Sequence, residues 1–180
     1  MKKYTTLLSL AMLMATGLSA QQLGKPAETE SEFDKAYAWR IRQENLDGVY
    51  IPKDLTEAFL ELNRLTEKSS REKYRNAPEE EATHRLFFSL GRWITTNWSF
   101  YEGSRLSEFL RKLGLHHPDD MALFIMITWH RSLNQSPLEV KNLVDSLEAK
   151  RKEELKEYLE RGTLLKEETR PKEKNQRERE

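Results

Sequence analysis

The sequence predicts an all-α fold, a compact single-domain bundle of about five to six helices around a central apolar helix at about residues 118–133. Apolar residues recur with helical spacing through most of the chain. Residues typical of helix starts and stops separate these segments. Residues 121–127 are apolar on every side, which is typical of a helix surrounded by other helices. Because this run contains β-branched residues, a strand over residues 123–128 is the rival interpretation.

Residues 1–20 have the order of a secretory signal peptide, with two lysines followed by an apolar stretch at residues 7–18. That stretch is shorter than the roughly 20 residues that a transmembrane helix needs, and no later apolar run is long enough to span a membrane. Cleavage after Ala20 would leave a flexible polar leader at residues 21–30. We therefore expect export to the periplasm or the cell exterior, with a retained N-terminal anchor as the alternative.

The composition limits the classes of partner. The chain has 30 basic and 30 acidic residues, and this balance argues against nucleic acid, since phosphate binding requires a basic surplus or patch. The chain has no cysteine, which excludes disulfides, thiolate metal sites and a lipid-modified cysteine at the cleavage site. We therefore expect an exported chain that is not lipid-anchored and is held together by its core between residues 33 and 147.

The first helix is expected at residues 31–45, where one face carries apolar and aromatic residues. Residues 47–48, Asp-Gly, indicate a turn, and an extended connector should follow because Pro52 disfavours helical geometry in the residue before it. Asp54 should cap a second helix, whose buried stripe ends near Leu65.

Residues 68–77 are polar, and we predict a loop there. A third helix should begin at Pro78 and run to about Asn97, because three glutamates in its first turn favour the positive end of the helix dipole. Gly91 lies inside this helix and costs about 1 kcal/mol relative to alanine. A close approach of two helices would justify a glycine at this position.

The fourth helix should begin at Gly103 or Ser104 and stop at Gly114. The central fifth helix follows, with Pro118 in its first turn and Asn134 as its expected terminator.

The sixth helix should begin at a capping box formed by residues 136–139 and continue as a highly charged helix to about Gly162. The helical domain is therefore expected at residues 31–162. Residues 163–180 are charged in both signs and nearly free of apolar residues, which predicts a disordered tail.

Three segments have an unusual mixture of polar and aromatic residues, at 91–105, 113–121 and 129–134. With residues 49–55, they resemble the motif set NW…GSRL, HPDDM and HR-LN of an uncharacterised bacterial family, often exported, known only as a domain of unknown function. The resemblance covers roughly residues 49–140. It implies a domain boundary there, and it implies no activity.

The same segments carry the candidate binding residues, which are aromatic or polar and lie at the ends of consecutive helices: Trp93, Asn97, Trp98, Tyr101, Arg105, Asp119, Asp120, His130 and Arg131. Clustered tryptophan and tyrosine can form a platform for sugar rings or for an anchor residue of a partner, although a core position is the alternative. The polar members are expected to form a network that either fixes the helix packing or lines a pocket.

Five residues have side chains of the metal-ligand type: His116, His117, Asp119, Asp120 and His130. Their spacing matches neither a helical His-x-x-x-His pair nor an HExxH motif, so we predict no metal and no cofactor. Asp119 and Asp120 are also candidates for a catalytic carboxylate pair. Helix capping with an ion pair to Arg105 or Arg131 is the alternative, and no catalytic residue is assigned.

These observations favour an exported, non-enzymatic interaction module whose partner is an envelope protein or a glycan. The alternative is a small envelope-acting hydrolase, which would use a polar cluster of Asp119, Asp120, His130 and Arg105 converging in a cleft. A third hypothesis is a structural role in which the charged C-terminal helix pairs with another copy, but its apolar stripe is too broken for a sustained heptad seam.

Overall fold

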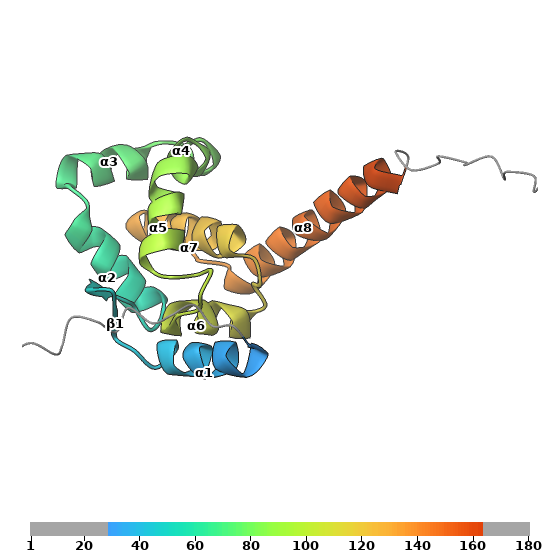
Figure 1. The fold of residues 1–180 in the computed structure, drawn as a ribbon. Coiled ribbons are helices and arrows are strands. Elements are labelled where there is room, and N and C mark those ends of the chain that lie inside the picture. The colour runs from blue at the N-terminus through green and yellow to red at the C-terminus, as the bar shows by residue number, and fades with distance from the viewer. Residues whose placement is uncertain (1–28, 164–180) are drawn as a thin grey trace, which may run out of the picture.

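The computed structural model describes residues 29–163. The expected signal peptide, nearly all of the leader and nearly all of the charged tail lie outside the described residues. Within them, the chain forms helices and one minor pair of strands, so the predicted all-α class is confirmed (Figure 1). The elements in chain order are α1 (Glu30–Arg40), β1 (Asn45–Leu46), β2 (Val49–Tyr50), α2 (Leu55–Leu65), α3 (Lys68–Asn76), α4 (Glu79–Leu86), the π-helical segment η1 (Phe87–Gly91), α5 (Arg92–Asn97), α6 (Arg105–Leu113), α7 (Pro118–Leu133) and α8 (Val140–Thr163).

The central apolar segment is the helix α7, so the rival strand interpretation is wrong. In Figure 1, α7 lies in the middle of the body, with α2 to one side, α3 and α4 above it, and α6 below it. Met121, Phe124 and Ile125 are completely buried, as expected for a helix that is apolar all round. His117 caps its start, because the imidazole Nδ1 accepts a hydrogen bond from the backbone N–H of Asp119.

The first helix, α1, ends at Arg40, five residues before the expected end. The chain then forms a hairpin, in which β1 and β2 are antiparallel. Asp47 and Gly48 both have positive φ, 50° and 80°, as a tight two-residue hairpin turn requires. The expected extended connector is therefore the second strand of this hairpin.

Residues 68–76 form the helix α3, and the prediction of a loop there is wrong. Tyr74 is the buried residue of this helix; its ring stacks on Trp129 of α7 with a centroid distance of 4.9 Å. Its hydroxyl donates a hydrogen bond to the carbonyl of Met126. A short polar helix is marginal in isolation, so this tertiary contact is the physical reason that α3 forms.

Ser104 and Gly114 bound α6 as predicted. The Ser104 side chain accepts a hydrogen bond from the backbone N–H of Ser107, and Gly114 ends the helix with a left-handed φ of 111°. Such a conformation strains any residue with a Cβ, so a glycine is required there.

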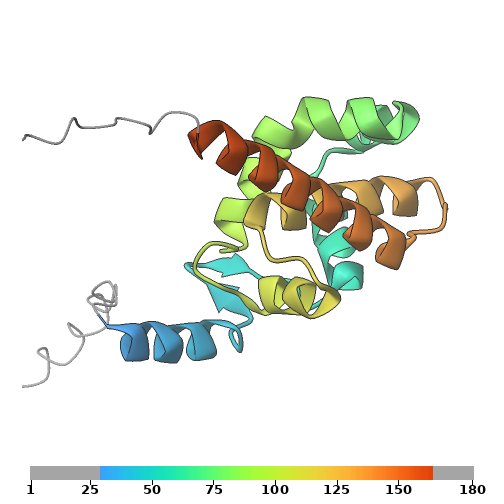
Figure 2. The ribbon, with the colours of Figure 1, turned by 90° about the vertical axis from the view of Figure 1, so that its right-hand side faces the viewer.

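The last helix begins at Val140, and the expected capping box at residues 136–139 does not form. Arg131 of α7 instead donates to the carbonyl of Leu138, and Glu139 turns the chain with a φ of 51°. Only the first half of α8 packs on the body, through Leu143, Val144 and Leu147. The second half projects away from it in Figure 1, and Figure 2 shows α8 crossing in front of α7. No helix in residues 29–163 combines the length and apolarity needed to cross a membrane.

Candidate functional site

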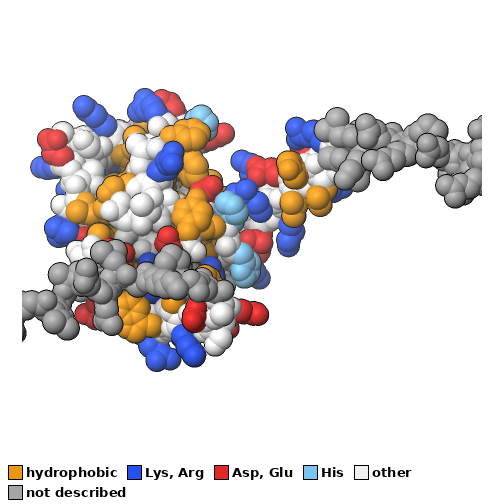
Figure 3. Space-filling view, viewed as in Figure 1, with side chains coloured by type: hydrophobic (Ala, Val, Ile, Leu, Met, Phe, Trp, Pro, Cys, Tyr) orange, Lys and Arg blue, Asp and Glu red, His pale blue; other side chains and the backbone are white. Residues whose placement is uncertain are grey.

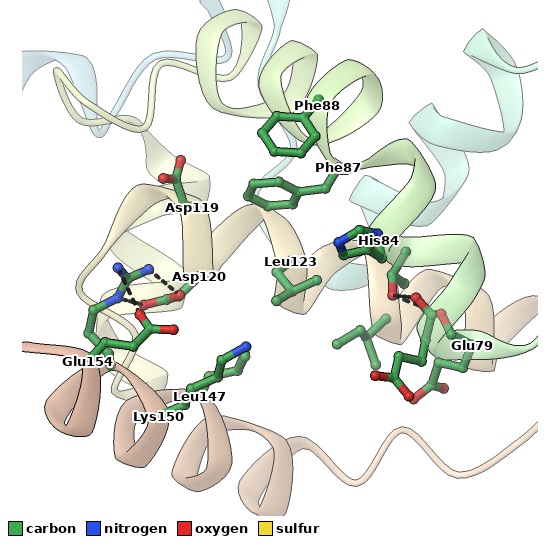
Figure 4. Close-up of a pocket in the computed structure, with 14 residues that line it drawn as sticks. Glu79, His84, Phe87, Phe88, Asp119, Asp120, Leu123, Leu147, Lys150 and Glu154 are labelled. Carbon is green, nitrogen blue, oxygen red and sulfur yellow. Dashed lines mark hydrogen bonds and ion pairs between the residues drawn. The ribbon is translucent and has the colours of Figure 1, made fainter. Parts of the chain in front are cut away.

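A groove of about 500 Å³ lies between α4 and η1 on one side and α8 on the other, with α7 as its floor (Figure 4). Five apolar side chains line it: Phe87, Phe88, Leu123, Ile127 and Leu147. Its polar lining comes mainly from charged residues at its rim. We call this feature the α7 groove.

The wall contributed by η1 is formed by two phenylalanines that lie at a local change in helix geometry. The π-helical turn interrupts the long helix expected at residues 78–97, and such turns occur frequently at functional sites. Phe88 is 76% exposed, and its ring lies edge-on to that of Phe87 at a centroid distance of 5.8 Å. The turn therefore presents a large aromatic side chain to solvent at the edge of the groove.

Gly91 ends η1 where that segment packs against α7. A Cβ at this position would lie 3.1 Å from the Phe87 ring and 3.4 Å from the sulfur of Met126. The close approach of two helices that the glycine indicated is therefore present, and it brings η1 against the floor helix.

One end of the groove is closed by an ion pair between α7 and α8. The guanidinium of Arg151 donates two hydrogen bonds to the Asp120 carboxylate, of 2.8 and 2.7 Å. The hydrogen bonds that Arg151 donates to Asp120 raise the pKa of Arg151 further above its usual range. Asp120 is only 7% exposed, so this bidentate pair holds a nearly buried charge.

The other end of the groove is formed by Glu79 and Glu80 at the start of α4. Arg131 donates two hydrogen bonds of 2.9 Å to Glu79 while also holding the Leu138 carbonyl. The neighbouring His130 places its Nε2 3.0 Å from the Ala77 carbonyl. These contacts tie the start of α4 to the end of α7 and to the loop that precedes α8.

Arg105 belongs to a third group, away from these two. Its Nε donates to the Ile51 carbonyl, and its other nitrogens lie 3.4 Å from carboxylate oxygens of Glu44 and Glu57. Its guanidinium also lies over the ring of Tyr50, 5.2 Å from the centroid. Arg105 therefore anchors the β1–β2 hairpin to α6.

The polar residues expected to converge thus have separate partners. Asp120 pairs with Arg151, rather than with Arg105 or Arg131, and Asp119 accepts a hydrogen bond from Tyr101. Of the predicted binding residues, Asp119 and Asp120 line the α7 groove. Arg131 holds Glu79, which is one of the groove's lining residues, and His130 lies beside it, with Nδ1 3.8 Å from a Glu79 carboxylate oxygen.

The aromatic segment forms a corner of the core, with one exception. Trp98 is fully buried, its ring lies edge-on to that of Trp93, and its indole Nε1 has no hydrogen-bond partner among the described residues. Asn97 donates to the carbonyl of Trp93 within the same helix. Tyr101 is 60% exposed, at the end of the groove where Asp119 lies. The segment therefore offers a single exposed aromatic ring.

Residues 29–163 contain no group of three or more His, Asp or Glu side chains arranged to hold a metal ion. The groove residues Phe87, Phe88 and Arg151 were absent from the predicted site. The adjacent phenylalanines could have indicated an exposed aromatic side chain. Two neighbouring residues on a regular helix point about 100° apart and cannot both face the same core surface. The contribution of Arg151 depends on how α8 crosses α7, which local spacing does not encode.

The described residues form a small helical domain with a partly apolar groove on its surface. Residues 51–133 match the model of the family described as "Domain of unknown function (DUF6794)". The predicted resemblance to a domain of unknown function is thereby confirmed, and α2 to α7 lie within the matched residues. No curated protein matches the chain, and no solved structure matches it.

Proposed function

We propose that this chain is an exported, non-enzymatic interaction module that binds a helical segment of a protein in the α7 groove. The observation that carries the proposal is the groove itself, an apolar floor between two helical walls with Phe88 exposed at its edge. Amphipathic helices bind in grooves of this kind through a stripe of apolar anchors. Export is supported by the signal-like order of residues 1–20.

The arrangement of charges supports binding over catalysis. Asp120, Arg131 and Arg105 are each held in bidentate or multiple hydrogen bonds to structural partners. Side chains engaged in this way fix the positions of helices and backbone. No observation favours the hydrolase alternative, because the groups that it needs belong to separate contacts.

A protein partner is favoured over a glycan. A sugar-binding platform requires several exposed aromatic faces, but among the aromatic residues of the segment 93–101 Trp98 is buried, Trp93 is partly buried and Tyr101 alone is exposed. The groove instead offers phenylalanine and aliphatic side chains, which match the apolar face of a helix.

Co-purification tests this function. A tagged chain is expressed with its natural N-terminus, and every protein that co-purifies is counted, an untagged copy of this chain included. We expect Phe88→Glu to abolish the co-purification, because a carboxylate at the groove edge opposes apolar docking. Leu60→Glu is the matched control, because Leu60 is also an exposed apolar residue but lies on α2. Equal recovery with wild type and Phe88→Glu contradicts the proposal.

A further inference from the structure

We propose that the occupant of the α7 groove is the projecting half of α8 from a second copy of this chain. This inference rests on the proposed function, since it names the partner that the same groove binds. Its starting observation is that the projecting half is itself apolar on one side: Leu155 is 56% exposed and Tyr158 is 72% exposed. Figure 3 shows hydrophobic side chains on this helix well away from the body.

The exposed side continues the face that α8 uses to pack on its own body. Leu155 and Tyr158 follow Val144 by 11 and 14 residues, which are close to three and four whole turns, so all three point in nearly the same direction. Val144 is buried in the core, while Leu155 and Tyr158 are exposed. Figure 1 shows the second half of α8 beyond the body. The apolar face of α8 therefore extends beyond the surface of the body on which its first half packs.

The spacing along α8 is symmetric about Arg151. Leu147 and Leu155 lie four residues on either side of Arg151, and Val144 and Tyr158 lie seven residues on either side. Two copies of α8 crossing antiparallel with a two-fold axis near Arg151 therefore bring Leu155 of each copy toward Leu147 of the other. Leu147 is a wall of the groove. This is an isologous contact, in which one surface is complementary to itself.

A single copy of the chain cannot place the projecting half of its α8 in its own α7 groove. The whole of Val140–Thr163 is one helix, and Figure 1 shows its second half running away from the body, so it does not fold back into the groove that its first half helps to form. A second copy brings an identical helix end to that groove and offers its own groove in return.

The charges agree with the antiparallel direction. Glu79 is joined through Arg131 to Leu138, just before α8, so the acidic end of the groove lies at the start of this helix. Glu80 is exposed there and has no ion-pair partner among the described residues. In an antiparallel pair the end of the partner's helix, with Arg161 exposed beside its own ion-pair partner Glu157, lies at this acidic end.

Mass in solution tests the inference, with the chain from Gln21 onward measured by light scattering coupled to size exclusion over a range of concentrations. We expect twice the mass of one chain for wild type. The double variant Leu155→Glu/Tyr158→Glu and the single variant Phe88→Glu should each have the mass of one chain. Leu60→Glu should keep the doubled mass. Because all of these positions are exposed, circular dichroism should show the same helix content in every variant.

Cross-linking gives the second measurement. The chain has no cysteine, so Phe88→Cys in one copy and Leu155→Cys in another provide single reactive thiols. We expect a thiol cross-linker to join a mixture of the two, and to leave Leu60→Cys mixed with Leu155→Cys unjoined. A wild-type mass of one chain at every concentration overturns the inference. If Phe88→Glu still abolishes co-purification of another protein in that case, the proposed function survives without it.

Discussion

The ion pair between Asp120 and Arg151 fixes α8 to the start of α7 and so sets the width of the α7 groove. We expect Arg151→Ala to lower the free energy of unfolding by about 1–3 kcal/mol, because it leaves a nearly buried carboxylate without its charged donor. The double variant Arg151→Ala/Asp120→Ala should lose less than the sum of the two single variants, since it leaves no unpaired charge. Urea unfolding of all four chains measures the coupling, and strict additivity would show that the pair does not act as a unit.

Glu57 of α2 holds the β1–β2 hairpin, and part of its contribution to the free energy of unfolding is lost at acid pH. Hydrogen bonds from the Lys53 ammonium, the Tyr50 hydroxyl and the Lys53 backbone N–H lower the pKa of Glu57 from 4.5 to about 2. A carboxylate whose pKa is lowered in the folded state stabilises the fold at pH values above its unfolded pKa of 4.5. This stabilisation is lost as the pH falls toward 2. The difference in free energy of unfolding between wild type and Glu57→Gln should therefore be full at pH 6 and shrink steadily below pH 4.5. A difference independent of pH would contradict this assignment.

Among the helices, α3 is the clearest case of an element made by its tertiary contacts. We expect Tyr74→Ala to lower the free energy of unfolding by about 3–5 kcal/mol, because it removes a buried ring that stacks on Trp129. Hydrogen exchange should show loss of protection in α3 before α7, and a peptide of residues 66–78 should have little helicity by circular dichroism. A stable helix in that peptide would show that local sequence, rather than Tyr74, determines α3.

The same element shows where prediction from sequence succeeded and where it failed. Helices with strong periodicity and explicit caps were predicted well: α6 between Ser104 and Gly114, and α7 from Pro118. The failures occurred where a distant contact decided the outcome, as Tyr74 does for α3 and as Arg131 does for the start of α8. The π-helical turn η1 also depends on packing, because its sequence has helical periodicity and no local signature of the extra residue.

The whole molecule combines a body packed around its core with a helix, α8, of which only the first half packs on that body. In a single copy the amides of residues 152–161 have few protecting contacts, and they should exchange quickly with solvent. If a second copy covers this half, protection there should rise with protein concentration, while α7 should exchange slowly at all concentrations. Hydrogen exchange measured by mass spectrometry at two concentrations compares these segments directly. Equal exchange of residues 152–161 at both concentrations would indicate that no second copy binds them.

For the candidate site, the sequence alone identified Asp119 and Asp120, which line the groove, and Tyr101, which contacts Asp119. It did not identify the apolar wall, because a groove is a property of how α4, α7 and α8 are placed. Arg105 and Trp98 were good candidates by residue type, but their positions in the fold assign them to the hairpin anchor and to the core. Burial decided which polar and aromatic residues remain available to a partner.

The central claim is that the α7 groove is a surface on which a protein docks. A photo-reactive phenylalanine analogue at position 88, introduced into the natural chain and activated in living cells, tests this most directly. We predict a discrete cross-linked adduct at position 88 and none at the control position 60, where the exposed leucine of α2 lies outside the groove. An adduct of twice the chain's mass would identify a second copy, and any other discrete mass would identify a different protein. The absence of any adduct at position 88 would contradict the account.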